Sequence, residues 1–232
     1  MINNSKVLCI IPARNGSKGL PKKNIMLLAG KPLIHWSIQS ALHSKYIDET
    51  IVSTDSHKIA SISKKSGATV PFLRPASLAT SKATTKDVII HAINQVERKG
   101  QYYKYIVLLQ PTSPLRTHKD IDESIEYLKN KSTKAVVSVC ETEHNPLWIN
   151  TLLKNKKMNN FVPKFFKNKN RQQLPKYYRI NGAIYVSDIS YFKENNGFIG
   201  DNTIAYIMPQ LRSVDIDTIL DFKLAEIIKS GL

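Results

Sequence analysis

A basic, glycine-containing loop directly follows the first apolar run of the chain. After Val-Leu-Cys at 7–9, residues 10–24 read Ile-Ile-Pro-Ala-Arg-Asn-Gly-Ser-Lys-Gly-Leu-Pro-Lys-Lys-Asn. Gly16 and Gly19 allow tight turns, so successive backbone N–H groups can converge on an anion. The loop's positive side chains, with no acid among them, are Arg14, Lys18, Lys22 and Lys23. Because open α/β sheets bind ligands beyond the carboxyl ends of their strands, we expect this loop to bind a triphosphate.

The common phosphate-binding fingerprints are missing from this loop. It contains neither G-x-x-x-x-G-K-[ST] nor a G-x-G-x-x-G that opens a helix, which disfavours an ordinary kinase or dehydrogenase. A solvated basic loop after a core strand is the alternative interpretation. The density of basic groups, together with Ser17 and Asn24, favours a ligand-binding loop.

The elements that position this loop follow from alternating apolar patterns. Buried strands are expected at residues 7–13, 49–53, 69–73, 105–109 and 135–139. Helices are expected at residues 33–42, 57–65, 85–99, 118–130 and about 219–229. Asp55 or Ser56 is a suitable cap for the second helix, and Pro32 suits the start of the first. Such strand–helix repeats predict one α/β domain with a doubly wound, mostly parallel sheet.

Two further loops follow predicted strands and should lie at the same sheet edge. Residues 74–85 are rich in small hydroxyl side chains, and Arg74 can bind a base edge or a phosphate through paired N–H groups. The alternative is a surface loop that caps the following helix. In residues 108–116 two prolines fix the backbone and hold Gln110 for substrate orientation, although a rigid turn into the next helix would have the same pattern.

Two aspartates precede the C-terminal helix, at Asp215 and Asp217. Residues two apart in an extended chain point to the same side, so the two carboxylates could converge on a cation. Mg²⁺ prefers oxygen ligands and is usually held by one or two carboxylates together with substrate phosphates. In the alternative interpretation, Asp217 or Thr218 caps the helix and Asp215 lies on the surface.

Composition and charge indicate a globular protein with an anionic partner. The chain has 232 residues, 42% of them hydrophobic, and a formal net charge of +16. Anionic small molecules, nucleic acid and membrane surfaces are all candidate partners for such a charge. Between residues 154 and 179 there is no acid, and the basic residues are Lys154, Lys156, Lys157, Lys164, Lys167, Lys169, Arg171, Lys176 and Arg179.

Targeting and redox signals are weak in this sequence. No apolar run approaches the roughly 18 residues that a membrane span needs, and Arg14 interrupts a faint likeness of the start to a signal peptide. Cys9 and Cys140 form no C-x-x-C or metal-binding spacing, so we expect buried thiols. We therefore expect a cytoplasmic protein with no membrane partner.

Residues 14–24 resemble the nucleotide-binding loop of the nonulosonate cytidylyltransferases. This family includes the CMP-N-acylneuraminate (CMP-sialic acid) synthetases and bacterial relatives that act on legionaminic or pseudaminic acid. The resemblance runs from Val7 to the C-terminal helix, with four motif blocks in the family's order. Enzymes that activate Kdo usually have an arginine where Lys18 and Gly19 stand here, so the resemblance favours the acylneuraminate branch.

The resemblance implies a nucleotide-diphospho-sugar transferase-like fold and a cytidylyltransferase reaction. The anomeric hydroxyl of a nine-carbon 2-keto sugar acid attacks the α-phosphorus of CTP, and pyrophosphate leaves. Pseudaminate or Kdo are the alternative acceptors. A basic nucleic-acid-binding protein is the alternative of another class; it would leave the Asp215 and Asp217 pair unexplained, and no nucleic-acid partner is expected.

The resemblance also implies roles for individual residues. CTP would be bound by Arg14, Asn15, Ser17, Lys18, Lys23, Asn24, Arg74 and Ala83. The acceptor would be bound by Thr85, Gln110, Arg171, Arg179 and Asn181. The residues that would act in catalysis are Lys23, Arg171 and Asp217. Asp215 and Asp217 would hold Mg²⁺, for which Mn²⁺ could substitute.

Residues 141–179 resemble the family's dimerisation arm, inserted late into an α/β domain that comprises residues 1–140 and 180–232. In the family this arm reaches toward the partner's site, so the resemblance implies a homodimer. Short antiparallel pieces are expected within it, at residues 147–153 and 160–163.

Two residues depart from the family pattern, the first in the loop at 74–85, where it bears on the loop's geometry, and the second in the arm, where it bears on the acceptor. Ser81 stands where relatives usually have an aspartate, and Trp148 stands where some sialic acid enzymes have a lysine. A large indole would change the polarity near the acceptor, which disfavours plain N-acetylneuraminate. A legionaminate-like sugar acid, with fewer hydroxyls and more acyl groups, is therefore a candidate substrate beside the sialic acids.

Overall fold

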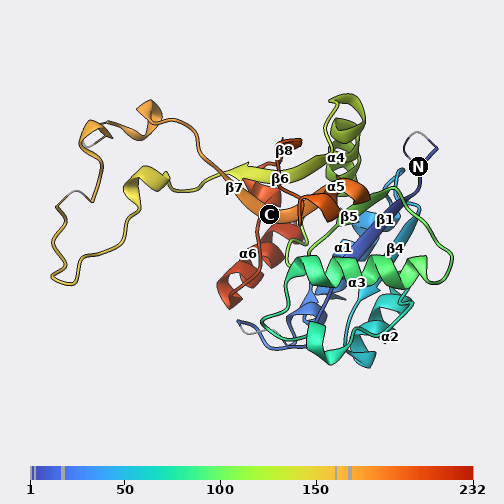
Figure 1. Cartoon of the computed structure of the whole chain (residues 1–232). Coiled ribbons are helices and arrows are strands. Elements are labelled where there is room, and N and C mark those ends of the chain that lie inside the picture. The colour runs from blue at the N-terminus through green and yellow to red at the C-terminus, as the bar shows by residue number, and fades with distance from the viewer. Residues whose placement is uncertain (1, 3, 17–18, 160, 167–168, 232) are drawn as a thin grey trace.

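The computed structural model describes residues 2, 4–16, 19–159, 161–166 and 169–231, apart from the side chain of Arg171 (Figure 1). Within these residues, a six-stranded sheet has the order β4-β1-β5-β7-β6-β8. Its strands are β1 Val7–Pro12, β4 Glu49–Ser53, β5 Tyr105–Leu108, β6 Ala135–Glu141, β7 Tyr178–Asp188 and β8 Thr203–Ile207. β7 is antiparallel to both of its neighbours, and the remaining neighbours pair in parallel. The predicted mostly parallel α/β sheet is confirmed.

Helices cover both faces of this sheet. They are α1 Leu33–Leu42, α2 His57–Lys65, α3 Thr85–Glu97, α4 His118–Asn130, α5 Ile189–Glu194 and α6 Ile219–Lys229. Side chains alternate along each strand, so Cys9 of β1 packs in one core with α1, α2 and α4, whereas Ile10 packs in another with α3 and α5. A strand buried on both faces requires the continuous apolar run seen in β1.

A third, smaller core anchors the segment that carries the two aspartates. It joins α6 to the hairpin of β2 Leu27–Leu28 and β3 Lys31–Pro32, with Leu28, Leu115 and Phe222 among its members. Ile216, between Asp215 and Asp217, is fully buried in this core. An apolar residue therefore fixes the backbone from which both carboxylates project.

Side-chain caps start the helices around the sheet's carboxyl edge. The Thr84 hydroxyl accepts the Asp87 N–H at the start of α3, and Ser56 caps α2 in the same way. At α6, Thr218 and Asp221 form a capping box. Because Thr218 rather than Asp217 supplies the cap, the Asp217 carboxylate remains available for another role.

The predicted strand at 69–73 and the antiparallel pieces predicted within the arm are wrong. Residues 69–73 form no strand beyond a single parallel bridge from Thr69 to Ile51, because Pro71 lacks the N–H that a further ladder bond needs. In the arm, the described residues form no antiparallel pieces at 147–153 or 161–163, and Asn160 lies outside the description. An isolated hairpin with no neighbouring strand or core gains too little to form.

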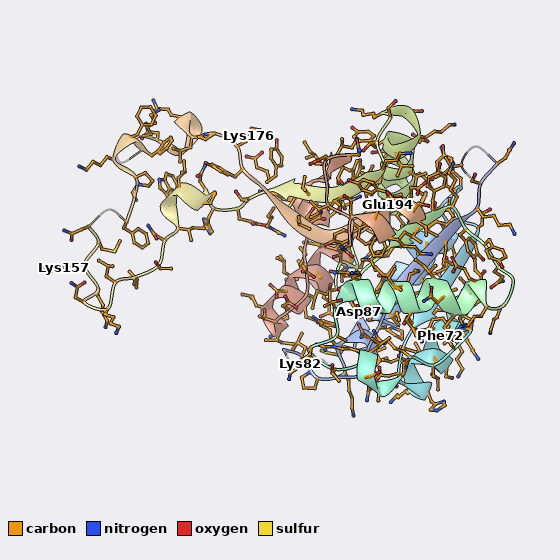
Figure 2. All side chains as sticks on the ribbon, viewed as in Figure 1. Phe72, Lys82, Asp87, Lys157, Lys176 and Glu194 are labelled. Carbon is orange, nitrogen blue, oxygen red and sulfur yellow. The ribbon has the colours of Figure 1, made fainter. Side chains whose placement is uncertain are left out.

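The segment between β6 and β7 leaves the sheet and extends away from it (Figure 1). Its described residues form short 3₁₀ turns, η3 Pro146–Trp148, η4 Lys164–Phe166 and η5 Arg171–Gln173. Figure 2 shows Lys157 at the outer end of this arm, while Lys176 lies nearer the sheet. Several large apolar side chains of the arm are exposed, namely Ile149, Leu152, Leu153, Met158 and Phe165.

Further 3₁₀ turns occur within the α/β domain, at η1 Lys23–Ile25, η2 Ala76–Leu78 and η6 Gln210–Arg212. Each of them leads into or out of a loop at the carboxyl edge of the sheet. Over the described part of the chain, no helix combines the length and apolar character that crossing a membrane would require.

Candidate functional site

A pocket of about 500 Å³ lies beyond the carboxyl ends of β1 and β5. This volume is in the range of small-molecule sites, roughly 300–1,000 Å³. Most of the predicted site residues line it, namely Arg14, Lys23, Asn24, Arg74, Ala83, Thr85, Gln110, Asp215 and Asp217. Ser17 and Lys18 lie outside the described residues. Loops far apart in sequence thus meet at the edge where the topology predicted a ligand.

The loop after β1 is held by contacts from several directions. The Asn24 side-chain amide donates to the Arg14 carbonyl at 3.0 Å, and the Arg14 guanidinium donates to the Thr80 carbonyl at 3.0 Å. At Gly19 a Cβ atom would lie 2.5 Å from the backbone oxygen of Asp217. Only glycine therefore lets this basic loop approach the aspartate segment so closely.

Lys23 joins the basic loop to the acidic segment. Its ammonium donates to Asp217 Oδ1 at 2.9 Å and also to the carbonyl of Ile216. The Lys23 side chain is 10% exposed, whereas that of Asp217 is 78% exposed. The pair therefore places a nearly buried positive charge beside a carboxylate that faces the pocket opening.

Asp215 is the buried member of the aspartate pair. Burial raises the pKa of its carboxyl group, and the nearby Asp217 charge adds to the increase, while Thr112 and Lys23 act in the opposite direction. Its Oδ1 atom is buried and has no hydrogen-bond partner within the described residues. A buried, unpartnered carboxylate oxygen is costly unless a ligand satisfies it.

This arrangement fits a divalent cation that is completed by substrate. Asp215 and Asp217 provide hard oxygen ligands, and one of these atoms is buried without a partner. In the described part of the chain, no group of three or more His, Cys, Asp or Glu side chains could hold a metal ion by itself. Two carboxylates plus substrate phosphates are the usual set for Mg²⁺.

Arg74 is a buried cation on the opposite wall of the pocket. Its side chain is 4% exposed, and Nη2 lies 3.9 Å from Asp55 Oδ1. Burial lowers the pKa of the guanidinium, and Asp55 partly offsets this effect. Among the described residues neither Nε nor Nη2 has a hydrogen-bond acceptor. These two free donors in fork geometry suit a planar base edge or a phosphate.

The resemblance assigns Arg74 to CTP, so its replacement by lysine is expected to raise the KM for CTP about tenfold or more, because an ammonium retains the charge but cannot donate two parallel hydrogen bonds. The KM for the acceptor should change little. Steady-state kinetics with each substrate varied in turn measures both values. Arg98→Lys, at an exposed arginine after α3, is the control; an equal effect of the two variants would argue against a ligand at Arg74.

Gln110 lies against a glycine of β7. A Cβ at Gly182, whose φ is +72°, would lie 2.7 Å from Gln110 Oε1 and 3.5 Å from Asp215 Oδ2. The Ile216 N–H donates to the Thr112 carbonyl at 2.8 Å, which ties the Gln110 loop to the aspartate segment. Gly182 is therefore the point at which the two parts of the site meet.

Gly182→Ala should lower the free energy of unfolding by about 1–3 kcal/mol, from positive-φ strain and the close contact. The resemblance assigns Gln110 to the acceptor, so displacement of its side chain should also raise the KM for the acceptor. Gly30→Ala is a matched control, since Gly30 has φ +74° and no described atom within 4 Å of its Cβ position. Urea denaturation and kinetics of both variants test this; equal kinetic effects would contradict a role for the Gln110 contact.

Several predicted residues lie outside the pocket lining as the described residues define it. Asn15 donates its backbone N–H to Asp55 at 2.9 Å. Arg179 makes two hydrogen bonds to Glu143, at 2.7 and 3.2 Å. Asn181 is fully buried and bonds to Ser138 and Ser213. The Arg171 backbone belongs to η5 on the arm, and its side chain lies outside the description.

The sequence interpretation assigned no role to some residues that shape the site. Arg116 is 1% exposed and donates to the carbonyls of Gln110 and Ala183. Thr112 and Gly182 bring the Gln110 loop to the aspartates. In the sequence, Arg116 is only an arginine at the end of a proline-fixed loop. Its hydrogen-bond partners come from distant parts of the chain, so no local pattern indicates its role.

The fold and pocket define a nucleotidyltransferase-type α/β protein. A solved structure of CMP:2-keto-3-deoxy-manno-octonic acid synthetase complexed with CTP superposes with a TM-score of 0.73, covering 98% of this chain and 100% of that one. The sequence identity is 14%, so this likeness concerns the fold. Residues 8–221 match the family described as cytidylyltransferase. The chain belongs to this cytidylyltransferase family.

Curated relatives confirm the resemblance seen in the sequence. CMP-N,N'-diacetyllegionaminic acid synthase of Legionella pneumophila is 36% identical over 95% of both chains. Pseudaminic acid cytidylyltransferase of Campylobacter jejuni is 33% identical over 96% of both chains. N-acylneuraminate cytidylyltransferase of Escherichia coli is 36% identical over 95% of this chain, which spans 51% of that relative's length.

Proposed function

We propose that this protein transfers CMP from CTP to a nine-carbon 2-keto sugar acid and releases pyrophosphate. The observation that carries this proposal is the pocket in which the cations of Arg14, Lys23 and Arg74 face Asp215 and Asp217 at the sheet edge. Relatives named for CMP-legionaminate, pseudaminate and N-acylneuraminate synthesis give the same reaction class. A triphosphate and a carboxylate substrate both suit a basic pocket.

In this proposal, different side chains of the pocket bind the phosphates, the cytidine and the sugar acid. Arg14 and Lys23 would hold the phosphates, and the free donors of Arg74, with Asn24, would bind the cytidine. Thr85 and Gln110 would orient the sugar acid so that its anomeric hydroxyl lies in line with the α-phosphorus. Alignment and neutralisation of charge supply most of the rate in such transfers, so no covalent nucleophile from the protein is required.

Asp215 and Asp217 would hold Mg²⁺, or Mn²⁺ in its place. When bound, the ion supplies positive charge that polarises the phosphate oxygens. The unpartnered Oδ1 of Asp215 would provide one ligand atom, and Asp217 also forms an ion pair with Lys23. Lys23 thereby stays between the acidic segment and the phosphates, where it can orient the leaving group.

We propose a legionaminic or sialic acid type of acceptor, with legionaminate favoured and pseudaminate or Kdo as the alternatives. Trp148 in place of a lysine supports an acceptor with more acyl groups. Pyrophosphate release from CTP with Mg²⁺ should be measured with N-acetylneuraminate, di-N-acetyllegionaminate, pseudaminate and Kdo, each against a blank without acceptor. We expect the highest kcat/KM with di-N-acetyllegionaminate. Preference for Kdo would contradict the proposed branch, and no release with any of the four would contradict the proposed substrate class.

We further propose that the enzyme is a homodimer in which the arm contacts the partner. The exposed apolar side chains of the arm support this, because such groups rarely stay in water on an extended segment. Light scattering should give a mass near twice 26.3 kDa. Ile149→Asp with Leu153→Asp should shift the mass to that of a monomer. Tyr102→Asp, at another exposed residue, should leave the dimer intact; dissociation by this control alone would contradict the arm's role.

A cytoplasmic location is also part of the proposal. Cys9 and Cys140 are both buried free thiols, which is the usual state in a reducing compartment. Fractionation of cells that express a tagged protein would test it, with the protein expected in the cytosolic fraction.

A further inference from the structure

A buried serine and arginine enclose the backbone carbonyl of Gln110 beneath the pocket. Ser37 of α1 is fully buried, and Arg116 is 1% exposed. The guanidinium donates to the Gln110 carbonyl through Nη2 and to Ser37 Oγ through Nη1, the latter at 2.9 Å. Ser37 Oγ in turn lies 3.4 Å from the Gln110 carbonyl. This pair is called the Gln110 clamp below.

The clamp also fixes the surface against which the Gln110 side chain rests. Arg116 Nε donates to the carbonyl of Ala183 at 2.8 Å. The preceding residue is Gly182, whose Cβ position lies 2.7 Å from Gln110 Oε1. One guanidinium therefore holds both the backbone of Gln110 and the part of β7 that its side chain contacts.

The chemistry of the clamp requires an arginine. Burial lowers the pKa of Arg116 to about 10, so the group remains charged at neutral pH and keeps all of its N–H donors. Its three acceptors come from α1, β7 and the loop after β5, and only a planar fork reaches them together. Among the described residues no carboxylate forms an ion pair with this guanidinium, so its hydrogen bonds, together with the more distant charges of Asp120 and Asp215, offset the cost of burial.

We propose that Ser37 and Arg116 are positioning residues that set the orientation of Gln110 toward the acceptor sugar acid. They control the KM for the acceptor rather than the KM for CTP, because Arg74 and the loop after β1 hold the nucleotide independently. This inference rests on the proposed function of the pocket and deepens it, since it assigns acceptor recognition to a buried polar network outside the pocket lining.

Ser37→Ala is the decisive variant, and Ser40→Ala is its matched control. Ser40 lies one turn further along α1 and donates to the backbone carbonyls of Trp36 and Arg116, and among the described residues it forms no hydrogen bond to the guanidinium or to Gln110. We expect Ser37→Ala to raise the KM for di-N-acetyllegionaminate about three- to tenfold, because it removes the hydrogen bond from Arg116 and the longer one to the Gln110 carbonyl. The KM for CTP and kcat should stay within about twofold, and Ser40→Ala should change neither KM.

Arg116→Lys provides a second, stronger test. It should raise the acceptor KM more than Ser37→Ala does, and the melting temperature of each variant shows whether it folds. Parallel increases in both KM values, no change in either, or an equal effect of Ser40→Ala would overturn the inference. The wild-type enzyme, assayed alongside, separates the two claims. If the wild type is active but the variants change both KM values alike, the proposed role of the clamp is wrong and the proposed function stands. If the wild type uses no acceptor, both the proposed function and the role of the clamp are wrong.

Discussion

Asp217→Asn is expected to lower the turnover number by about a hundredfold or more while the protein stays folded. In the proposed mechanism the substitution removes one of the two carboxylates that would hold the metal ion beside the phosphates of CTP, and loss of a preorganised charge at a reacting centre has effects of this size. The Asp217 side chain is 78% exposed, and asparagine has nearly the same shape, so the substitution changes little packing. Pyrophosphate release at saturating CTP and Mg²⁺ measures the effect, and thermal unfolding checks the fold.

Replacement of the neighbouring Asp215 is expected to have a different combination of effects on turnover and on thermal stability. Because burial raises the pKa of its carboxyl group, the ionised form is disfavoured in the folded protein, and stability from this group falls as the pH rises above the ordinary value for an aspartate. Asp215→Asn should therefore abolish turnover but raise the melting temperature at pH 7. Asp201→Asn, in an exposed turn, is the control. If Asp217→Asn or Asp215→Asn retains activity with Mg²⁺, the proposal that these two aspartates hold the metal ion is wrong.

Arg212→Met is expected to lower the free energy of unfolding by about 2–3 kcal/mol. Arg212 binds Asp120 through two hydrogen bonds, at 2.7 and 3.1 Å, just before the segment that carries Asp215. The Asp120 side chain is 1% exposed and that of Arg212 is 38% exposed. Breaking a fully buried pair costs about 3–5 kcal/mol, and the partial exposure of Arg212 reduces this value. Urea denaturation at pH 7 measures the change.

The Arg212 effect should depend on pH. Burial raises the pKa of Asp120, but hydrogen bonds from Arg212 and Thr117 outweigh this, and the pKa lies below its ordinary value. The pair therefore stabilises the fold above the ordinary pKa of an aspartate, and this stability is lost as the pH falls through the lower folded value. The difference in the free energy of unfolding between wild type and the Arg212→Met variant should become smaller below about pH 4. Lys45→Met, which breaks the exposed pair with Glu126, should have little effect at any pH; a gap that does not vary with pH would contradict the assignment.

The regular part of the fold could be predicted from the sequence because its signals are local. The strand at 49–53 contains the β-branched run from Thr50 to Val52. The helix at 118–130 has apolar residues at helical spacing and begins at a Thr117 capping box. The strand at 69–73 failed because Pro71 removes a ladder donor. Short elements such as α5 and β8 depend on packing against β6 and β7, so their sequences carry little signal of their own.

The candidate site was predictable where it follows strand ends, and less so where distant segments meet. The spacing of Asp215 and Asp217 predicted that the two side chains share one site, and both line the same pocket, although they project from an irregular segment fixed by the buried Ile216 rather than from a strand. Asn181 looks like a binding residue in the sequence, yet its amide is used by Ser138 and Ser213 in the interior. The roles of Arg116 and Gly182 depend on tertiary approach, which a local pattern cannot report.

The most direct test of the proposed reaction is ³¹P nuclear magnetic resonance of CTP incubated with the protein, Mg²⁺ and di-N-acetyllegionaminate. We expect the α-phosphorus signal of CTP to be replaced by that of a phosphodiester, with one equivalent of inorganic pyrophosphate formed for each. Formation of CDP with inorganic phosphate would show attack at the γ-phosphorus instead and contradict CMP transfer. Unchanged CTP in the presence of all four candidate sugar acids, with folded protein, would contradict it equally.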